Sequence, residues 1–217
     1  MASPDIRGVI FDMDGVIADT DEMHFQTWQR LANEEGVAFS RDKYLRMSGV
    51  GHLDNERIFT EGLTVDRATL DNWMARKQEY YVELRDTLQP KDVMAGIPSL
   101  IQDVKAHGLK IGVGSSSRNA RPVLKRLGLV DEFEVIGDGY TVKNLKPASD
   151  IFLWVAGGLK LLPQHCLVLE DAIAGVTAAQ NAGCYVIGVG SAPLNEAHAQ
   201  VESLANTSLN DLLKLLK

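Results

Sequence analysis

The sequence predicts an α/β protein in which a Rossmann-like parallel sheet is flanked by helices and a helical cap domain is inserted after the first strand. Short apolar, β-branched runs alternate with segments of helical periodicity, which is the pattern of βαβ units. The runs lack the alternation of a strand with one solvated face, so we expect them to be buried on both faces. One region breaks this rhythm, because residues 20–88 contain helical patterns and no convincing strand.

Five strands and four helices are expected in the α/β part. The strands are residues 8–11, 110–114, 133–137, 166–169 and 185–190. The helices are residues 99–107, 119–127, 148–159 and 172–182. Gly108, Gly128 and Gly183 stand where helix C-caps belong, since glycine tolerates the left-handed conformation that ends many helices.

The helical region reads as an inserted domain. Residues 23–35 and 70–88 carry its clearest helical patterns. A block of this length without a strand is too long for a simple crossover between two strands. We therefore expect a core domain of residues 1–19 and 90–217 and a helical cap domain of residues 20–89.

The composition is that of a globular protein with a core of normal size. Of the 217 residues, 45% are hydrophobic and 24% are charged, and the net charge is −7. That acidity argues against a nucleic-acid binder, which needs a dense cationic surface. No apolar stretch reaches the roughly 20 residues of a membrane span, and no secretory signal pattern is present. We expect a cytoplasmic monomer without membrane partners, whose two cysteines, Cys166 and Cys184, are buried thiols.

The strongest chemical signal is the segment FDMDGVIADT. A strand ends on Asp12, Asp14 follows two residues later, and Gly15 supplies backbone freedom. Functional residues of parallel sheets gather past the carboxyl ends of the strands, and two carboxylates there repel each other unless a cation lies between them. This predicts a divalent metal site. The alternative is a pair of turn-forming aspartates; a calcium loop fits poorly, because Val16 follows Gly15 where further ligands are required.

A second acidic pair occurs in LVLEDAIAG. Another buried strand ends on Glu170 and Asp171, ahead of a helix rich in small residues. Asp171 alone could be the N-cap of that helix. Two separate strands that end in paired acids nevertheless favour a shared cation.

Hydroxyl groups follow the strand in KIGVGSSSRN. Three serines, Arg118 and Asn119 stand where a helix begins, so hydroxyl and backbone N–H groups meet in a way that suits an anion. A structural N-cap by Ser117 or Asn119 is the alternative.

The fourth segment, LKPASDIF, places Lys146 before a proline that fits the start of a helix. A lone lysine there could equally be solvated. Together, however, the four segments supply two acid pairs, hydroxyls and a cation at strand ends or helix starts. Phosphoryl transfer requires that set, because its catalysis is positioning and charge neutralisation.

In this order the four segments resemble the signature motifs of the haloacid dehalogenase (HAD) superfamily of phosphatases and phosphotransferases. The resemblance covers the whole chain, including a helical cap after the first motif, and is greatest to the β-phosphoglucomutase branch. It rests on the segments DMDGVIADTDEMHFQTW, ARKQEYYV, GSSSRN, KPASDIF and LEDAIAG.

The resemblance implies roles for the core residues. Asp12 attacks phosphorus and becomes an aspartyl phosphate, which splits a hard displacement into two steps, and Asp14 is the general acid/base. Ser115 and Lys146 hold the oxygen atoms of the transferred phosphoryl group. The implied cofactor is Mg²⁺, with ligands from Asp12, the backbone carbonyl of Asp14, Glu170 and Asp171.

The resemblance also implies substrate-binding residues. Thr20 and His24 match the hinge of the mutases, where His24 helps to place the acid/base. The other implied contacts are Trp28 and Lys77 in the cap, Gly49 and His52 in the cap loop MSGVGHLDN, and Ser117, Arg118 and Asn119 in the core. Ordinary packing is the alternative for His24 and Trp28, which lie four residues apart on one helical face.

The cap loop departs from the mutase pattern. His52 stands where the mutases carry an arginine that grips the second phosphate of a sugar bisphosphate, and Ser48 replaces a lysine. A neutral imidazole cannot replace a permanently charged guanidinium. Arg46 or Arg57 could substitute only if its side chain reached the site.

Three functions follow as hypotheses. The first is a phosphotransferase acting on sugar phosphates, of the kind that converts β-glucose 1-phosphate to glucose 6-phosphate. The second is a phosphatase of the same fold that hydrolyses a sugar or polyol phosphate, which the histidine at position 52 favours. The third is a non-catalytic phosphate- or metal-binding protein. In each case the expected partner is a small phosphorylated molecule.

Overall fold

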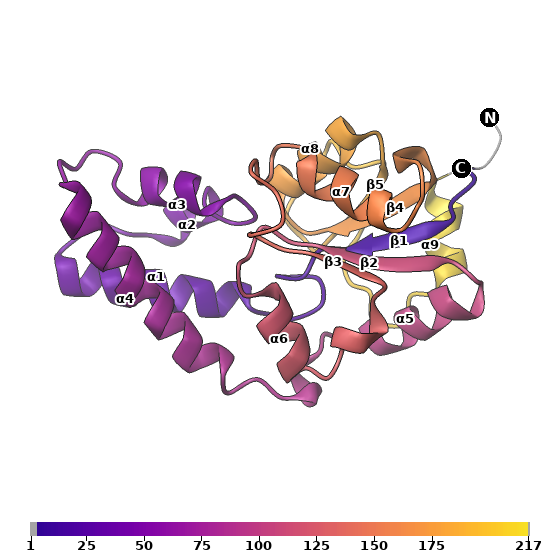
Figure 1. Ribbon diagram of the computed structural model, residues 1–217, viewed down its shortest axis with the longest axis horizontal. Helices are drawn as coiled ribbons and strands as arrows, with labels where there is room; N and C mark the ends of the chain where they lie inside the picture. Colours follow the sequence, from indigo (N-terminus) through magenta and orange to yellow (C-terminus); the bar gives the residue numbers. More distant parts are fainter. Residues whose placement is uncertain (1–3, 217) are drawn as a thin grey trace.

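The computed structural model describes residues 4–216 and contains one parallel sheet of six strands in the order β3-β2-β1-β4-β5-β6 (Figure 1). Every neighbouring pair is parallel. The strands are β1 (Gly8–Phe11), β2 (Lys110–Gly114), β3 (Val135–Gly137), β4 (Cys166–Glu170), β5 (Tyr185–Val189) and β6 (Ala199–Val201). The predicted α/β class and the five predicted strands are confirmed; the edge strand β6 was not predicted.

Helices cover both faces of the sheet. These are α5 (Ile97–Ala106), α6 (Ala120–Arg126), α7 (Asp150–Gly158), α8 (Ile173–Ala182) and α9 (Leu209–Leu215), with short 3₁₀ turns at Pro90–Asp92, Val130–Glu132 and Pro163–His165. Val9 and Phe11 of β1 pack with α5, α6 and α9, whereas Ile10 packs with α7 and α8. Successive residues of one strand thus enter two separate cores, which explains the continuous apolar run in the sequence.

Glycines end these helices as predicted. Gly183 is the C-cap of α8 and has a positive φ. Gly108 and Gly128 lie one residue beyond the C-caps of α5 and α6 and are also left-handed. Cys166 and Cys184 are buried free thiols, as expected.

Two helix starts differ from the prediction. The helix predicted at residues 148–159 begins at Asp150, so Pro147 precedes α7 and does not open it; the loop before α7 turns inward to bury Lys146. The helix predicted at residues 70–88 is α4 (Arg67–Arg85), which starts earlier because the Asp66 carboxylate accepts a hydrogen bond from the backbone N–H of Thr69.

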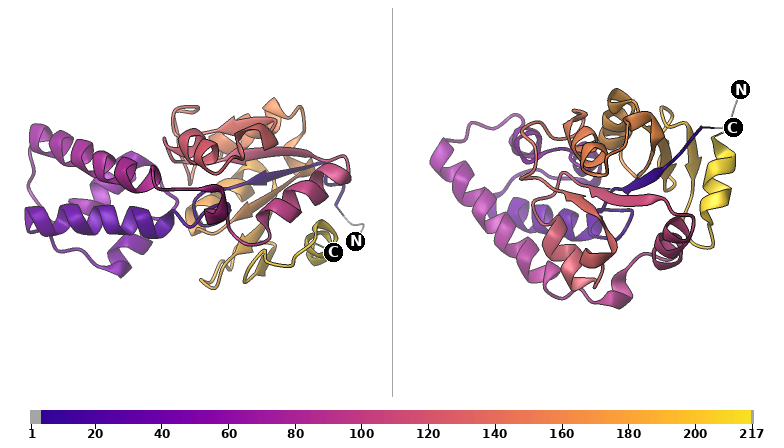
Figure 2. Two further views of the ribbon diagram at one scale, coloured as in Figure 1. Left: turned by 90° about the horizontal axis from the view of Figure 1, so that it is seen from below. Right: turned by 45° about the vertical axis from the view of Figure 1, so that its right-hand side comes forward.

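Four helices between β1 and β2 form a group of their own, on the left in Figure 1. They are α1 (Asp21–Glu35), α2 (Arg41–Leu45), α3 (His52–Phe59) and α4. The long helices α1 and α4 lie side by side (Figures 1 and 2), and Trp28, Phe59 and Trp73 pack in a core separate from those of the sheet. This group faces the carboxyl ends of the strands.

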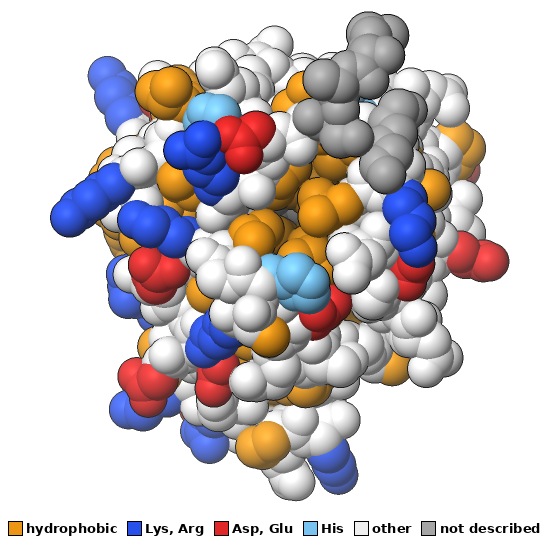
Figure 3. Space-filling view, turned by 90° about the vertical axis from the view of Figure 1, so that its right-hand side faces the viewer, with side chains coloured by type: hydrophobic (Ala, Val, Ile, Leu, Met, Phe, Trp, Pro, Cys, Tyr) orange, Lys and Arg blue, Asp and Glu red, His pale blue; other side chains and the backbone are white. Residues whose placement is uncertain are grey.

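The end of the molecule opposite this helical group shows cationic and anionic side chains interspersed among hydrophobic ones (Figure 3). Across residues 4–216, every helix is either too short or too polar to span a lipid bilayer. Charged side chains of functional interest gather instead at the carboxyl ends of the strands.

Candidate active site

A cavity of about 260 Å³ lies between the helical group and the carboxyl ends of the strands. Most of the predicted site residues line it: Asp12, Asp14, His24, Trp28, Gly49, His52, Lys77, Ser117, Arg118, Asn119, Lys146 and Asp171. Thr20, Ser115 and Glu170 do not line it, because all three are fully buried behind its wall. Segments from both ends of the chain therefore meet at one place, as parallel strands require.

The floor of the cavity contains a buried cation between two carboxylates. Lys146 Nζ lies 2.6 Å from Asp12 Oδ1 and 2.8 Å from Glu170 Oε2. Burial alone would lower the pKa of Lys146, but the two carboxylates outweigh it and raise that pKa above its usual value. The solvated lysine that was one reading of the sequence is therefore wrong.

The acidic side chains here exceed the positive charge available to them. One oxygen each from Asp12, Glu170 and Asp171 lies within 4.8 Å of the other two. Burial and Glu170 raise the pKa of Asp12 to about 8, and burial with Glu170 and Asp12 raises the pKa of Asp171 well above its ordinary value. Lys146 offsets only one of three carboxylates. Hard oxygen ligands in this arrangement fit a divalent cation.

Two glycines make space for these acids. A Cβ atom on Gly175 would lie 2.0 Å from the Glu170 carboxylate, and one on Gly15 would lie 1.9 Å from Asp171 Oδ2. Gly15 also has a φ of +76°, in the left-handed region. Asp171 is not the N-cap of α8, since that position is held by Ala172. The backbone is thus shaped around the carboxylates of this acidic cluster.

Asp14 is held by residues at the start of α1. Thr20 Oγ1 donates a hydrogen bond to Asp14 Oδ1, and His24 Nε2 lies 3.7 Å from the same oxygen. Burial acts to raise the pKa of Asp14, but the interactions with His24 and Thr20 outweigh it and lower that pKa. The carboxylate is therefore fixed beside Asp12 in its ionised form.

His24 links this acid to α4. Its Nδ1 lies 2.9 Å from Lys77 Nζ, and its ring stacks on Tyr81 with a centroid distance of 4.1 Å. Burial lowers the pKa of Lys77 to about 7. Lys77 Nζ also lies 5.2 Å from the ring centroid of Trp28. His24 therefore makes polar contacts with Asp14 and Lys77 in addition to its packing against Tyr81.

The segment after β2 forms a compact turn. Ser115 Oγ accepts a hydrogen bond from Ser117 N at 3.0 Å, and Ser117 Oγ accepts one from Asn119 N at 3.1 Å. Asn119 occupies the N-cap of α6 without a capping side-chain bond. Its Oδ1 instead accepts hydrogen bonds from Gln78 and Arg85 of α4. Asn119 therefore holds the N-cap position but does not cap the helix with its side chain, which joins the core to the helical group.

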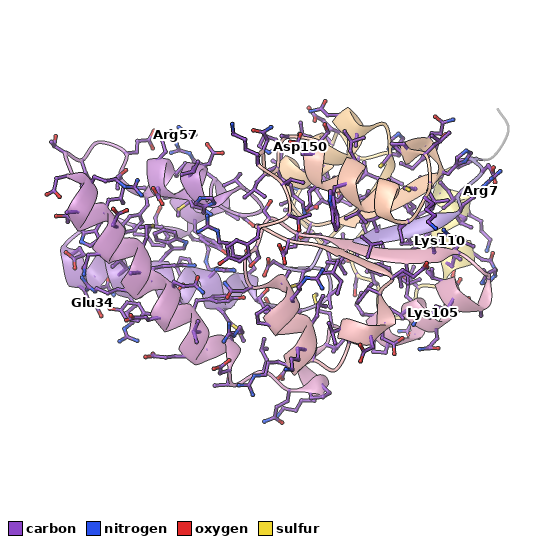
Figure 4. All side chains as sticks on the ribbon, in the orientation of Figure 1. Arg7, Glu34, Arg57, Lys105, Lys110 and Asp150 are labelled. Carbon is purple, nitrogen blue, oxygen red and sulfur yellow. The ribbon has the colours of Figure 1, made fainter. Side chains whose placement is uncertain are left out.

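The cap loop contacts the core closely. Gly49 has a φ of +73°, and a Cβ there would lie 2.6 Å from the Cβ of Ala172. His52 Nε2 lies 2.8 Å from Arg118 Nη2. The substitute cations considered from the sequence do not line the cavity: Arg46 pairs with Glu61, and Arg57 points outward from α3 (Figure 4).

The family follows from comparison with known proteins. Residues 9–189 match the family described as haloacid dehalogenase-like hydrolase. The chain belongs to the haloacid dehalogenase-like hydrolases. The motifs that suggested the superfamily from sequence are thereby confirmed at family level.

Relatives of this haloacid dehalogenase-like hydrolase include a mutase and a phosphatase. It is 40% identical to the β-phosphoglucomutase of Bacillus subtilis over 189 residues, which cover 85% of this chain and 84% of that protein. It is 32% identical to the phosphorylated carbohydrates phosphatase of Thermotoga maritima over 98% of this chain and 99% of that protein. The β-phosphoglucomutase structure from Clostridium difficile has a TM-score of 0.91 at 34% identity, covering 97% of each chain.

The lining of the cavity in this hydrolase also includes residues that were not predicted from the sequence, among them Asp21, Asn55 and Ser116. Asp21 Oδ1 accepts hydrogen bonds from Tyr44 and Ser48. Asn55 Oδ1 and Ser116 Oγ are buried without a partner in residues 4–216. Helical spacing from His52 indicates the face of Asn55, and Ser116 lies between two predicted serines. Asp21 directly follows Thr20, a predicted site residue, and this neighbourhood could have indicated it as a site residue.

Proposed function

We propose that this protein is a magnesium-dependent phosphotransferase that acts on sugar phosphates through Asp12 and converts β-glucose 1-phosphate to glucose 6-phosphate. The observation that carries the proposal is the buried Asp12–Lys146–Glu170 group on the floor of the cavity, with Asp171 beside it. The 40% identity to the Bacillus subtilis β-phosphoglucomutase supports the substrate.

In the proposed reaction, an Asp12 oxygen attacks phosphorus. The bond from Asp12 to phosphorus forms while the bond from phosphorus to the leaving oxygen breaks. Asp14, which is ionised in the free protein and must gain a proton before this step, gives that proton to the leaving oxygen. In the second step the phosphoryl group passes from Asp12 to a sugar hydroxyl, whose proton goes to Asp14 as the bond from Asp12 to phosphorus breaks. Lys146 and Ser115 hold oxygen atoms of the phosphoryl group. Asp12, Glu170, Asp171 and the carbonyl of Asp14 would hold Mg²⁺, which when bound neutralises charge on the transferred group.

Residues 20–89 are proposed to act as a cap domain that closes over the sugar. Their separate core supports this division, as do the cap-side residues that line the cavity. Closure would exclude water and favour transfer to a sugar hydroxyl. The cytoplasmic location and the monomeric state stay predictions.

A sugar-phosphate phosphatase is the second candidate. One observation favours it: the cap loop presents His52 to the cavity and no cation of its own. A mutase must rebind a bisphosphate in two orientations, whereas a phosphatase needs one phosphate site and admits water. The Thermotoga maritima relative, a phosphorylated carbohydrates phosphatase, is in line with this alternative.

The two reactions are separated by ³¹P NMR of β-glucose 1-phosphate with the enzyme, Mg²⁺ and a catalytic amount of glucose 1,6-bisphosphate. We expect the glucose 6-phosphate signal to grow without inorganic phosphate. Release of inorganic phosphate without isomerisation would refute the mutase and support the phosphatase. No conversion of this or other sugar phosphates would support the non-catalytic alternative.

A further inference from the structure

The contact between His52 and Arg118 joins the cap loop to the core at the rim of the cavity. His52 opens α3, and Arg118 lies in the turn after β2, 66 residues away in the sequence. The two nitrogen atoms, His52 Nε2 and Arg118 Nη2, lie 2.8 Å apart. Both residues line the cavity.

The chemistry of the pair defines the state of the histidine. A guanidinium has only donors, so His52 Nε2 must be the acceptor and must carry no proton. The neutral ring then carries its proton on Nδ1, which is buried without a partner in residues 4–216. Arg118 is thus the only hydrogen-bond partner of this imidazole in that part of the chain.

Arg118 differs from the other cations of the cavity. Lys146 is held by two carboxylates, and Lys77 is buried against His24. Among residues 4–216 no carboxylate pairs with Arg118, whose side-chain hydrogen bond is to His52. Its guanidinium lies 5.2 Å from the ring centroid of Tyr140, so Tyr140 and His52 alone restrain a cation that is otherwise free to meet an anion.

We propose that His52 is a positioning residue that holds the Arg118 guanidinium at the rim of the cavity, where Arg118 binds the substrate oxygens farthest from Asp12. This rests on the proposed function, since it concerns substrate binding in the same cavity. It also gives a role to the histidine that replaces the arginine of the mutases at position 52. The cap loop supplies a hydrogen-bond acceptor, His52, and the core supplies the cation, Arg118.

The contact depends on pH, because a protonated His52 has no lone pair for Arg118. Arg118 from the core and Glu56 on the same helix are the charged groups that face the ring, Tyr140 lies beyond Arg118, and Arg67 already pairs with Glu56. Burial and Arg118 lower the pKa of His52 below its usual 6.5. The contact is therefore intact at neutral pH and is lost as pH falls through that lowered pKa.

The tautomer and pKa of His52 can be measured by ¹⁵N NMR without any substrate. In the wild-type protein we expect a proton on Nδ1 and none on Nε2 at pH 7.5. Arg118→Met should raise the pKa of His52, because it removes a neighbouring positive charge. A proton on Nε2, or a pKa that Arg118→Met leaves unchanged, would overturn the proposal even if the protein has a different enzymatic function.

Kinetics with β-glucose 1-phosphate test the role in binding. His52→Leu removes the acceptor and should raise KM on the order of ten-fold at pH 7.5 while changing kcat much less. In the wild-type protein, KM should rise as pH falls through the pKa of His52, because the protonated ring cannot accept from Arg118. His52→Gln offers an amide oxygen that does not titrate, so it should restore KM at pH 7.5 and should not show this rise at lower pH. Arg57→Gln, on the outer side of the same helix, is the matched control.

Comparison of variants at one pH cancels the ionisation of the substrate phosphate. Equal KM values for the wild-type protein and His52→Leu, or a failure of His52→Gln to restore KM, would contradict the positioning role. Absence of turnover would contradict the proposed function alone, because the NMR measurement tests the His52–Arg118 contact independently.

Discussion

Gly15 and Gly175 lie directly against the carboxylates of Asp171 and Glu170. From the sequence, Gly15 was expected only to give backbone freedom. The structure adds a steric reason, since any side chain at either position would occupy the space of an acid of the proposed metal site. The positions of these two acids thus depend on neighbouring residues that have no reactive side chain.

Gly175→Ala should weaken Mg²⁺ binding by about ten-fold or more, because the new Cβ would displace the Glu170 carboxylate. Gly157→Ala is the matched control: Gly157 is in helix α7 with no atom within 4 Å of an added Cβ, so the change should leave Mg²⁺ affinity unaltered. Titration of activity against Mg²⁺ checks both. Equal Mg²⁺ affinity in the two variants would contradict the expected clash.

At the scale of elements, α1 and α4 carry the link from the acid to the substrate side of the cavity. His24 on α1 and Lys77 on α4 are 2.9 Å apart, and Lys77 is nearly fully buried. Burial lowers its pKa from 10.5 to about 7. Between these values the unfolded chain binds a proton that the folded protein does not, so the free energy of unfolding rises with pH in this window.

Lys77→Met should therefore stabilise the protein at pH 7, on the order of 2 kcal/mol after the loss of the contact with His24. The gain should shrink as pH rises toward 10.5, the ordinary pKa of lysine, above which the side chain is neutral in both states. Urea unfolding at pH 7 and pH 9.5, in the absence of metal, measures the difference. A gain that stays constant or grows with pH would show that the buried charge is not its cause.

Elements were predictable where their pattern is local. Continuous apolar runs predicted β1 to β5. The edge strand β6 has the sequence AQV, which contains no such run, and its middle residue, Gln200, is exposed. Helix α9 was not predicted, although its sequence carries an N-terminal helix signal: Ser208 and Asp211 form a capping box.

The site residues likewise divide into those that the sequence predicts and those that it does not. Asp12, Ser115 and Glu170 adjoin strand ends, so the parallel sheet alone brings them together. The contact of His52 with Arg118 was not predictable, since it depends on how the cap loop packs against a distant turn. No short-range pattern encodes such a contact.

At the scale of the whole molecule, the helical group and the sheet meet through a few contacts. Asn119 accepts hydrogen bonds from α4, His52 meets Arg118, and Gly49 abuts Ala172. The cavity is bounded by both groups of elements. We therefore expect its closure to be sensitive to added volume at this junction.

Gly49→Ala should open the molecule, because its Cβ would lie 2.6 Å from the Cβ of Ala172. KM should rise several-fold, and the radius of gyration from small-angle X-ray scattering should increase. Gly62→Ala is a close control: its φ of +82° is similarly left-handed, but no atom lies within 4 Å of the added Cβ. Both variants should lose about 1 kcal/mol of stability from backbone strain. An equal rise in KM in both would assign the effect to strain and not to the junction.

Transfer through Asp12 is tested most directly by trapping the phosphorylated enzyme. The protein is quenched during turnover of β-glucose 1-phosphate, reduced with borohydride, and its peptides are sequenced by mass spectrometry. We predict that the acyl phosphate maps to Asp12 and disappears in Asp12→Asn, whose activity falls by several orders of magnitude while the variant stays folded. Undiminished turnover by Asp12→Asn, or a phosphoryl group trapped on another residue, would contradict the nucleophilic role of Asp12.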